Sequence, residues 1–331
     1  MNDGNGGSMY TGDALRSTRR DVLIAGGGVA MAGLAGCLSG DSEAGGIGGG
    51  EGSNDEISAV AGSFFMLYDL AINVAGETLD VEDLVPTGAH GDDWEPDPGV
   101  IEDVASADVF VYIDGFRAWS DDIAASLPED YPDVVVVDAA EGIEYIEGED
   151  GRDDDPHFWM DPPKAIQAVE NIRDGFVDAD PNNAETYEEN ADAFIAEIED
   201  VHDRFEETME NRTKNLIVIG SHDSFQYWTR RYGIEIYSPV GISPDAEPTP
   251  EEMERVDDLV TEHGLDYVLY DKYEPTDLAD ALAEETGTET LPLSPIEATT
   301  EEQLDQGMGW VEHMLEINLE TLRKALAVEG E

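Results

Sequence analysis

The sequence predicts an α/β fold of two lobes with parallel sheets, joined by one long rigid helix, with a binding site in the cleft between the lobes. Short apolar runs alternate with segments of helical periodicity over residues 57–161 and again over residues 212–331. Such alternation is typical of parallel strands with right-handed crossovers. Between the two series, residues 162–211 read as almost wholly helical. Hydrophobic residues make up 40% of the chain, enough for a buried core.

The first series predicts an N-terminal lobe. The run from Val109 to Ile113 is nearly all apolar, as expected for a strand that is buried on both faces. The other expected strands or extended segments are 57–61, 79–85 and 134–137, and the expected helices are 64–75, 99–107 and 119–127.

The helical stretch predicts two helices, because Asp180-Pro181-Asn182-Asn183 marks a stop and a new start. After it, apolar residues recur every three or four positions and form one stripe. A helix of roughly 25 residues spans about 38 Å and can run across both lobes. The stripe consists of Tyr187, Ala191, Phe194, Ile195, Ile198, Val201, Phe205 and Met209.

The second series predicts a C-terminal lobe with the same pattern. The expected strands or extended segments are 216–219, 234–237, 267–270 and 288–293. The expected helices are 222–232, 250–263, 276–286 and a closing helix over 301–327. Ligands of such folds bind beyond the carboxyl ends of the strands and between lobes.

The charge balance is extreme, with 78 acidic and 16 basic residues among 331 and a net charge of −62. Such a field repels nucleic acids, which excludes them as partners. The excess of acidic residues indicates either a disordered acidic tail or a folded protein adapted to very high salt. Because the acidic residues are interleaved with apolar periodic segments, they favour the second interpretation. At molar salt the Debye length is about 3 Å, which screens the repulsion.

The single cysteine, Cys37, excludes a disulfide framework and a cysteine-rich metal site. Residues 17–23 read Ser-Thr-Arg-Arg-Asp-Val-Leu, and a short apolar run follows over 24–38. This run is too short for a comfortable membrane span. The pattern resembles a twin-arginine export signal that ends in the lipobox Leu34-Ala35-Gly36-Cys37. Residues 1–36 are then the signal, and Cys37 carries the lipid at the outer face of the cell membrane.

A dinucleotide-binding loop is the alternative for this segment, since residues 21–28 resemble a strand that enters a glycine loop. However, Met31 stands at the sixth position of the G-x-G-x-x-G pattern, and no helix and second strand follow. The Gly-, Ser- and acid-rich residues 40–55 follow instead. We therefore expect a flexible tether over residues 37–56.

Two longer motifs contain the histidines of interest. Asp-Pro-His-Phe-Trp-Met-Asp-Pro over 155–162 holds His157 where the first lobe passes into the helices. Residues 221–233 hold His222 directly after a predicted buried strand. Both motifs resemble the zinc/manganese-binding receptors of metal ABC importers, of the halophilic archaeal type. The resemblance runs in order over residues 57–326, including residues 245–249 and Asp271 ahead of their helices.

This resemblance implies an exported, lipid-anchored receptor that binds a divalent metal ion and delivers it to an ABC permease. The resemblance also implies that the protein is a monomer and is not an enzyme. It implies that His157 and His222 are two of the metal ligands. Two neutral imidazoles with one or two carboxylates suit four-coordinate zinc, and extra carboxylates make manganese the second choice. His202, His263 and His313 lie in or near predicted helices and receive no function.

The other two ligand positions depart from the family pattern. The family's first loop, Gly-x-Asp-Pro-His-x-Tyr-Glu-Pro, corresponds to residues 88–96, where Asp92 stands at the histidine position and His90 two residues earlier. Either residue can bind a metal. The family's last ligand is an aspartate in Leu-Asp-Pro-Leu, and Ser294 replaces it here. Ser294, a water, or Glu297 three residues on are the candidates for this weak fourth position.

Three further interpretations stay open. The acidic residues 147–155 precede His157; they gather cations through their field or are simply a solvated loop of a salt-adapted protein. A metallohydrolase would need a general base, for which Asp271 or Glu297 is available, but no hydrolase motif is present. The third interpretation is a receptor for an organic ligand or a metal complex. It is motivated by Ser294 and Asp92, which stand at the two positions that depart from the family pattern.

Overall fold

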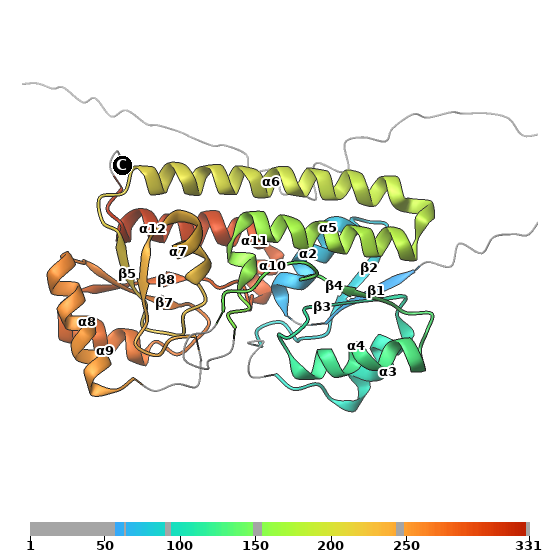
Figure 1. The fold of residues 1–331 in the computed structure, drawn as a ribbon, viewed down its shortest axis with the longest axis horizontal. Coiled ribbons are helices and arrows are strands. Elements are labelled where there is room, and N and C mark those ends of the chain that lie inside the picture. The colour runs from blue at the N-terminus through green and yellow to red at the C-terminus, as the bar shows by residue number, and fades with distance from the viewer. Residues whose placement is uncertain (1–56, 63, 90–93, 148–153, 243–247, 329–331) are drawn as a thin grey trace, which may run out of the picture.

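The computed structural model describes residues 57–62, 64–89, 94–147, 154–242 and 248–328. Two α/β lobes lie side by side, and one long helix runs along both of them (Figure 1). In the part of the chain that is described, no helix combines the length and the apolar character needed to cross a membrane. The predicted two-lobe architecture with parallel sheets is therefore present.

The N-terminal lobe contains one parallel sheet in the order β2-β1-β3-β4. Its strands are β1 (Ser58–Ala61), β2 (Asp80–Asp83), β3 (Val109–Tyr112) and β4 (Val135–Asp138). Its helices are α2 (Phe65–Ala75), α3 (Pro98–Ser106) and α4 (Ala118–Asp130). On β3, Val111 packs in the main core while Phe110 packs against α3 and α4, so this strand is buried on both faces as expected.

The C-terminal lobe repeats this strand order. Its strands are β5 (Leu216–Val218), β6 (Glu235–Tyr237), β7 (Tyr267–Asp271) and β8 (Glu289–Leu293), and its first helices are α7 (Gln226–Tyr232), α8 (Pro250–His263) and α9 (Asp277–Thr286). The parallel pairs β5–β6 and β7–β8 are joined by a parallel bridge between Ile219 and Leu269. The resulting order, β6-β5-β7-β8, matches that of the first sheet.

Two helices connect the lobes, α5 (Pro162–Ala179) and α6 (Ala184–Glu210), separated by a short 3₁₀ turn at Pro181–Asn183. The 27 residues of α6 span about 40 Å. Its stripe is buried as predicted, except that Ile195 is only partly buried. One part of α6 packs on α2 and α5 of the first lobe, and another packs on the C-terminal helices. The helix is therefore a strut fixed to both lobes (Figure 1).

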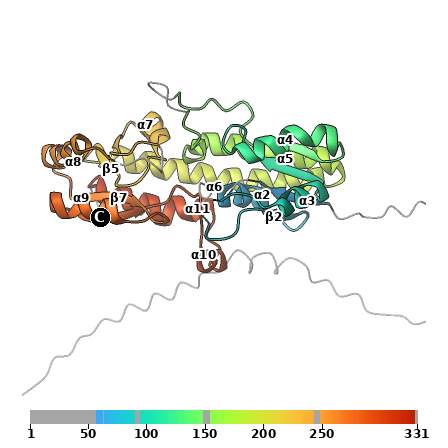
Figure 2. The ribbon, with the colours of Figure 1, turned by 90° about the horizontal axis from the view of Figure 1, so that it is seen from below.

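The prediction of one closing helix over residues 301–327 is wrong. This stretch is divided into α10 (Glu301–Asp305), α11 (Trp310–Glu312), a π-helical turn (His313–Leu319) and α12 (Glu320–Ala325). Gly307 has a φ of 72°, which ends the first segment. The carboxylate of Asp69 on α2 then accepts a hydrogen bond from the backbone N–H of Trp310 at 2.7 Å. This contact between distant segments fixes where the chain restarts, and α10 projects from the body of the molecule (Figure 2).

The predicted start of the helix after β5 is also wrong. This helix, α7, begins at Gln226, so His222 lies in a non-helical segment. Asp223 causes the delay, because its Oδ1 accepts a hydrogen bond from the backbone N–H of Phe225 at 3.0 Å. The segment can therefore turn the imidazole of His222 toward the other lobe.

Candidate metal site between the lobes

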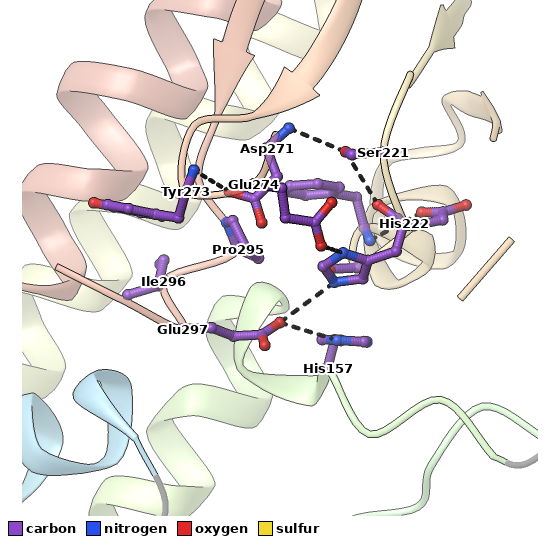
Figure 3. Close-up of polar contacts among 12 residues, drawn as sticks. His157, Ser221, His222, Asp271, Tyr273, Glu274, Pro295, Ile296 and Glu297 are labelled. Atoms are coloured by element: carbon purple, nitrogen blue, oxygen red, sulfur yellow. Dashed lines mark hydrogen bonds and ion pairs between the residues drawn. The ribbon is translucent and has the colours of Figure 1, made fainter. Parts of the chain in front are cut away.

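The candidate site is built by three chain segments that meet at the junction of the lobes. His157 immediately precedes the 3₁₀ helix Phe158–Met160, at the exit of the N-terminal lobe. His222 follows the carboxyl end of β5, and Glu297 follows the carboxyl end of β8. The ends of parallel strands are where α/β folds place their ligands. Figure 3 shows the three side chains pointing toward one another.

The three functional groups converge on one point. Oε1 of Glu297 lies 3.1 Å from Nε2 of His157 and 3.7 Å from Nε2 of His222. The imidazole centroids are 5.7 Å apart. His157 is 5% exposed, His222 1% and Glu297 1%. One ligand atom from each residue lies within 4.8 Å of the other two, which is a geometry that a single divalent cation can bridge.

Each imidazole is supported by a carboxylate on its other nitrogen. Nδ1 of His157 lies 2.6 Å from Oδ1 of Asp155, and Nδ1 of His222 contacts Oε1 of Glu274. This arrangement orients each ring and leaves Nε2 toward Glu297. The hydroxyl of Ser224 also lies 2.5 Å from Nε2 of His222, so a bound cation would take the place of that contact.

The charges of the site are strongly coupled. Burial alone would lower the pKa of His157, but the carboxylates of Asp155 and Glu297 outweigh it and raise this pKa to about 9. Burial is likewise outweighed at His222, where Glu274 and Glu297 hold the pKa well above its usual value. Burial would raise the pKa of Glu297, whereas the two imidazoles hold it well below its usual value. Protons therefore occupy the imidazoles where a cation would bind.

His222 also belongs to a second cluster of side chains that could hold a metal ion, together with Asp271 and Glu274. Oδ1 of Asp271 accepts a hydrogen bond from the backbone N–H of Tyr273 at 2.9 Å. The backbone N–H of Asp271 in turn donates to Oγ of Ser221 at 3.0 Å. The bond between Asp271 and Ser221 ties the end of β7 to the segment that follows β5.

Ser294 and Glu297, the two residues considered for the last ligand position, have different surroundings. Oγ of Ser294 lies 2.8 Å from Nδ1 of His313, and its backbone N–H donates to Asn318 at 2.8 Å. Ser294 is thus engaged with the π-helical turn and does not belong to the converging group. Ile296, at a left-handed φ of 65°, turns the chain before Glu297.

The remaining predicted residues lie outside the described residues, namely Cys37, His90 and Asp92. Ala89 lines a cavity of about 260 Å³ together with Ala298. The residue before His90 and the residue after Glu297 therefore line the same cavity. This leaves the first loop as a candidate source of a further ligand.

Sequence reasoning assigned no role to Asp155 and Glu274, the two supporting carboxylates. Asp155 stands two residues before His157 in the same motif, so its spacing was an available signal. Glu274 is 52 residues from His222 and gives no local signal. His313, which also received no function, is buried and hydrogen-bonded to Ser294.

Comparison with known proteins gives consistent matches over most of the chain. Residues 60–325 match the family model of the periplasmic zinc-uptake complex component A, ZnuA. The chain is 29% identical to the high-affinity zinc uptake system protein ZnuA of Bacillus subtilis (strain 168), over 82% of this chain and 88% of that protein. It is also 29% identical to the zinc-binding lipoprotein AdcA of Streptococcus pneumoniae (strain ATCC BAA-255 / R6), over 81% of this chain but 56% of AdcA.

A solved structure agrees with these matches. The Zn(II)-bound ZnuA-like domain of AdcA from Streptococcus pneumoniae superposes with a TM-score of 0.71 at 28% identity, covering 82% of this chain and 99% of that domain. The relatives are receptors of metal uptake systems and not enzymes, which removes the metallohydrolase interpretation. From its fold and from the extent of the match, this chain belongs to the family of the periplasmic zinc-uptake complex component A.

Proposed function

We propose that this protein is an extracytoplasmic receptor that captures a zinc ion with His157, His222 and Glu297 and delivers it to an ABC permease. The convergence of two Nε2 atoms and one carboxylate at a buried point between the lobes carries the proposal. Neutral imidazole and carboxylate oxygen are ordinary zinc ligands, and four-coordinate zinc needs one more.

The fourth ligand is assigned to the first loop, through Asp92 or His90. The cavity that Ala89 and Ala298 line together supports this assignment, because the start of the loop and the residue after Glu297 face the same space. The identity of this fourth ligand affects which metal the site prefers. A third imidazole would favour zinc, whereas a second carboxylate would raise the oxygen content and improve binding of manganese, the second candidate cargo.

The proposed location is the outer face of the cell membrane, with lipid on Cys37 and residues 37–56 as the tether. The relative AdcA of Streptococcus pneumoniae is a zinc-binding lipoprotein, which supports this location. A Cys37→Ser protein is expected in the medium, and retention on membranes at the wild-type level would contradict the anchor.

Zinc binding is tested by competition with a zinc-chelating dye in high salt, on protein without a chelating tag. The variants His157→Ala, His222→Ala and Glu297→Ala each remove one ligand, and we expect each to lower zinc affinity by at least about tenfold, since one of the groups that coordinate the metal is lost. His263→Ala is the control, because His263 is exposed at the end of α8.

Two outcomes would overturn the proposal. One is a wild-type affinity for zinc and manganese no better than that of the His157→Ala, His222→Ala double variant. This result would favour the receptor for an organic or complexed ligand. The other is an equal loss in the His263→Ala control, which would show that binding occurs on the acidic surface and not in the site.

A further inference from the structure

A separate cavity of about 500 Å³ adjoins the site, and none of the three proposed zinc ligands lines it. Its walls come from the start of α7, the segment after β6 and the chain just before His157. Four acidic residues and one basic residue, Arg230, are among its lining residues; the acidic ones are Glu147, Asp155, Asp223 and Glu252. The cavity is therefore predominantly negative.

Asp155, one of the residues that line the cavity, has one oxygen without a hydrogen-bond partner in the described part of the chain. Its Oδ1 accepts a hydrogen bond from the backbone N–H of His157 at 3.0 Å and also supports the ring of His157. Its Oδ2 is buried and has no hydrogen-bond partner in the described part of the chain, and the residue is 3% exposed. A buried carboxylate oxygen without a partner is unfavourable, which points to a missing ligand.

Asp223 supplies a second buried carboxylate, at 4% exposure. It accepts hydrogen bonds from the backbone of Phe225 at 3.0 Å and from the side chain of Gln226 at 2.5 Å. Asp155 is close enough to repel it electrostatically. Two buried carboxylates that repel each other across one cavity are stabilised by a cation between them.

We propose that this cavity binds a hard divalent cation such as Ca²⁺ or Mn²⁺, anchored by Oδ2 of Asp155 and the carboxylate of Asp223. Thr229 and Ser238 are also among the residues that line the cavity. Hard cations take carboxylate, hydroxyl, carbonyl and water oxygens, whereas zinc prefers the imidazoles of the neighbouring site. The two positions thus select different ions.

Asp155 couples the two positions. A cation on its Oδ2 withdraws negative charge from the carboxylate that supports His157, and it places positive charge near the zinc site. Both effects weaken zinc binding, and by linkage zinc weakens binding in the cavity. This coupling rests on the proposed function, while occupancy of the cavity does not.

Occupancy is tested with crystals of the full, zinc-loaded protein grown in molar KCl and soaked in MnCl₂. Anomalous differences are recorded at the manganese edge and at the zinc edge. We expect a manganese peak beside Asp155 and Asp223, and its absence would overturn the inference. A missing zinc peak at His157, His222 and Glu297 would instead count against the proposed function, so the two failures are distinguishable.

Coupling is tested by zinc titration with and without Ca²⁺ in molar KCl. We expect Ca²⁺ to lower the zinc affinity of the wild type about fivefold. Asp223→Asn should abolish this dependence, and Asp258→Asn, the same change at an exposed position on α8, should preserve it. Equal Ca²⁺ dependence in all three proteins would contradict the coupling.

Discussion

The supporting carboxylates define the chemistry of the site at the scale of single residues. Glu274 contacts Nδ1 of His222 and Asp155 contacts Nδ1 of His157, so both Nε2 atoms face Glu297. A ring held in this way loses less freedom when it binds a metal, and it is a stronger ligand.

Removing one support should therefore weaken binding without removing a ligand. Glu274→Gln is expected to lower zinc affinity by about tenfold, the lower end of the range for such partners. The matched control is Glu284→Gln, at an exposed position on α9. Competition titration measures both, and unchanged affinity in Glu274→Gln would show that Glu274 does not orient His222.

The raised histidine pKa values predict proton release. The pKa of His157 is raised to about 9, so without metal this imidazole is mostly protonated at pH 8, although an ordinary histidine is not. Zinc needs the unprotonated ring, so affinity should fall as the pH drops from about 9 and not only below 6.5. Calorimetry at pH 8 in two buffers of different ionisation enthalpy counts the protons. If no proton is released on zinc binding, the raised pKa of His157 is contradicted.

At the scale of elements, α6 and the segments packed on it hold the site residues in place. Phe205 of α6 is fully buried, and its ring centroid lies 5.7 Å from that of Trp228 and 5.6 Å from that of Tyr232, both on α7. Since α7 follows the segment of His222, this contact connects the strut to the site.

Phe205→Ala should lower the free energy of unfolding by about 3–5 kcal/mol, the usual cost of a buried phenylalanine. Glu199→Ala on the exposed face of the same helix should change it by less than about 0.5 kcal/mol. Urea denaturation in molar KCl measures both. Equal values for the two variants would mean that the stripe of α6 does not carry the packing.

The sequence predicted the elements whose signals are local. The stripe of α6 and the apolar run of β3 were correctly located, because periodicity and burial are encoded within each segment. The break in the closing helix was missed although Gly307 is a local signal for it, whereas the point where the helix restarts depends on the contact between Asp69 and Trp310, 241 residues apart. The role of Glu274 was missed because Glu274 lies 52 residues from His222. The late start of α7 depends on a local bond, from the backbone N–H of Phe225 to the side chain of Asp223, and the helical pattern alone does not reveal it.

At the scale of the whole molecule, the net charge of −62 dominates. Self-repulsion of this size destabilises a compact state unless salt screens it, and at 1 M salt the Debye length is about 3 Å. We therefore expect folding to require roughly molar salt. Circular dichroism through a KCl titration tests this, and an unchanged cooperative fold in dilute buffer without divalent ions would contradict it.

His157 of the N-terminal lobe faces His222 and Glu297 of the C-terminal lobe at a buried point, and the central claim is that a single zinc ion bridges the lobes there. X-ray absorption spectroscopy of the zinc-loaded protein in molar KCl tests this claim most directly. We predict one zinc with two imidazoles and carboxylate oxygen if Asp92 completes the site, or three imidazoles if His90 does, at Zn–N distances of about 2.0–2.1 Å. A shell of oxygen alone, without imidazole scattering, would contradict the account.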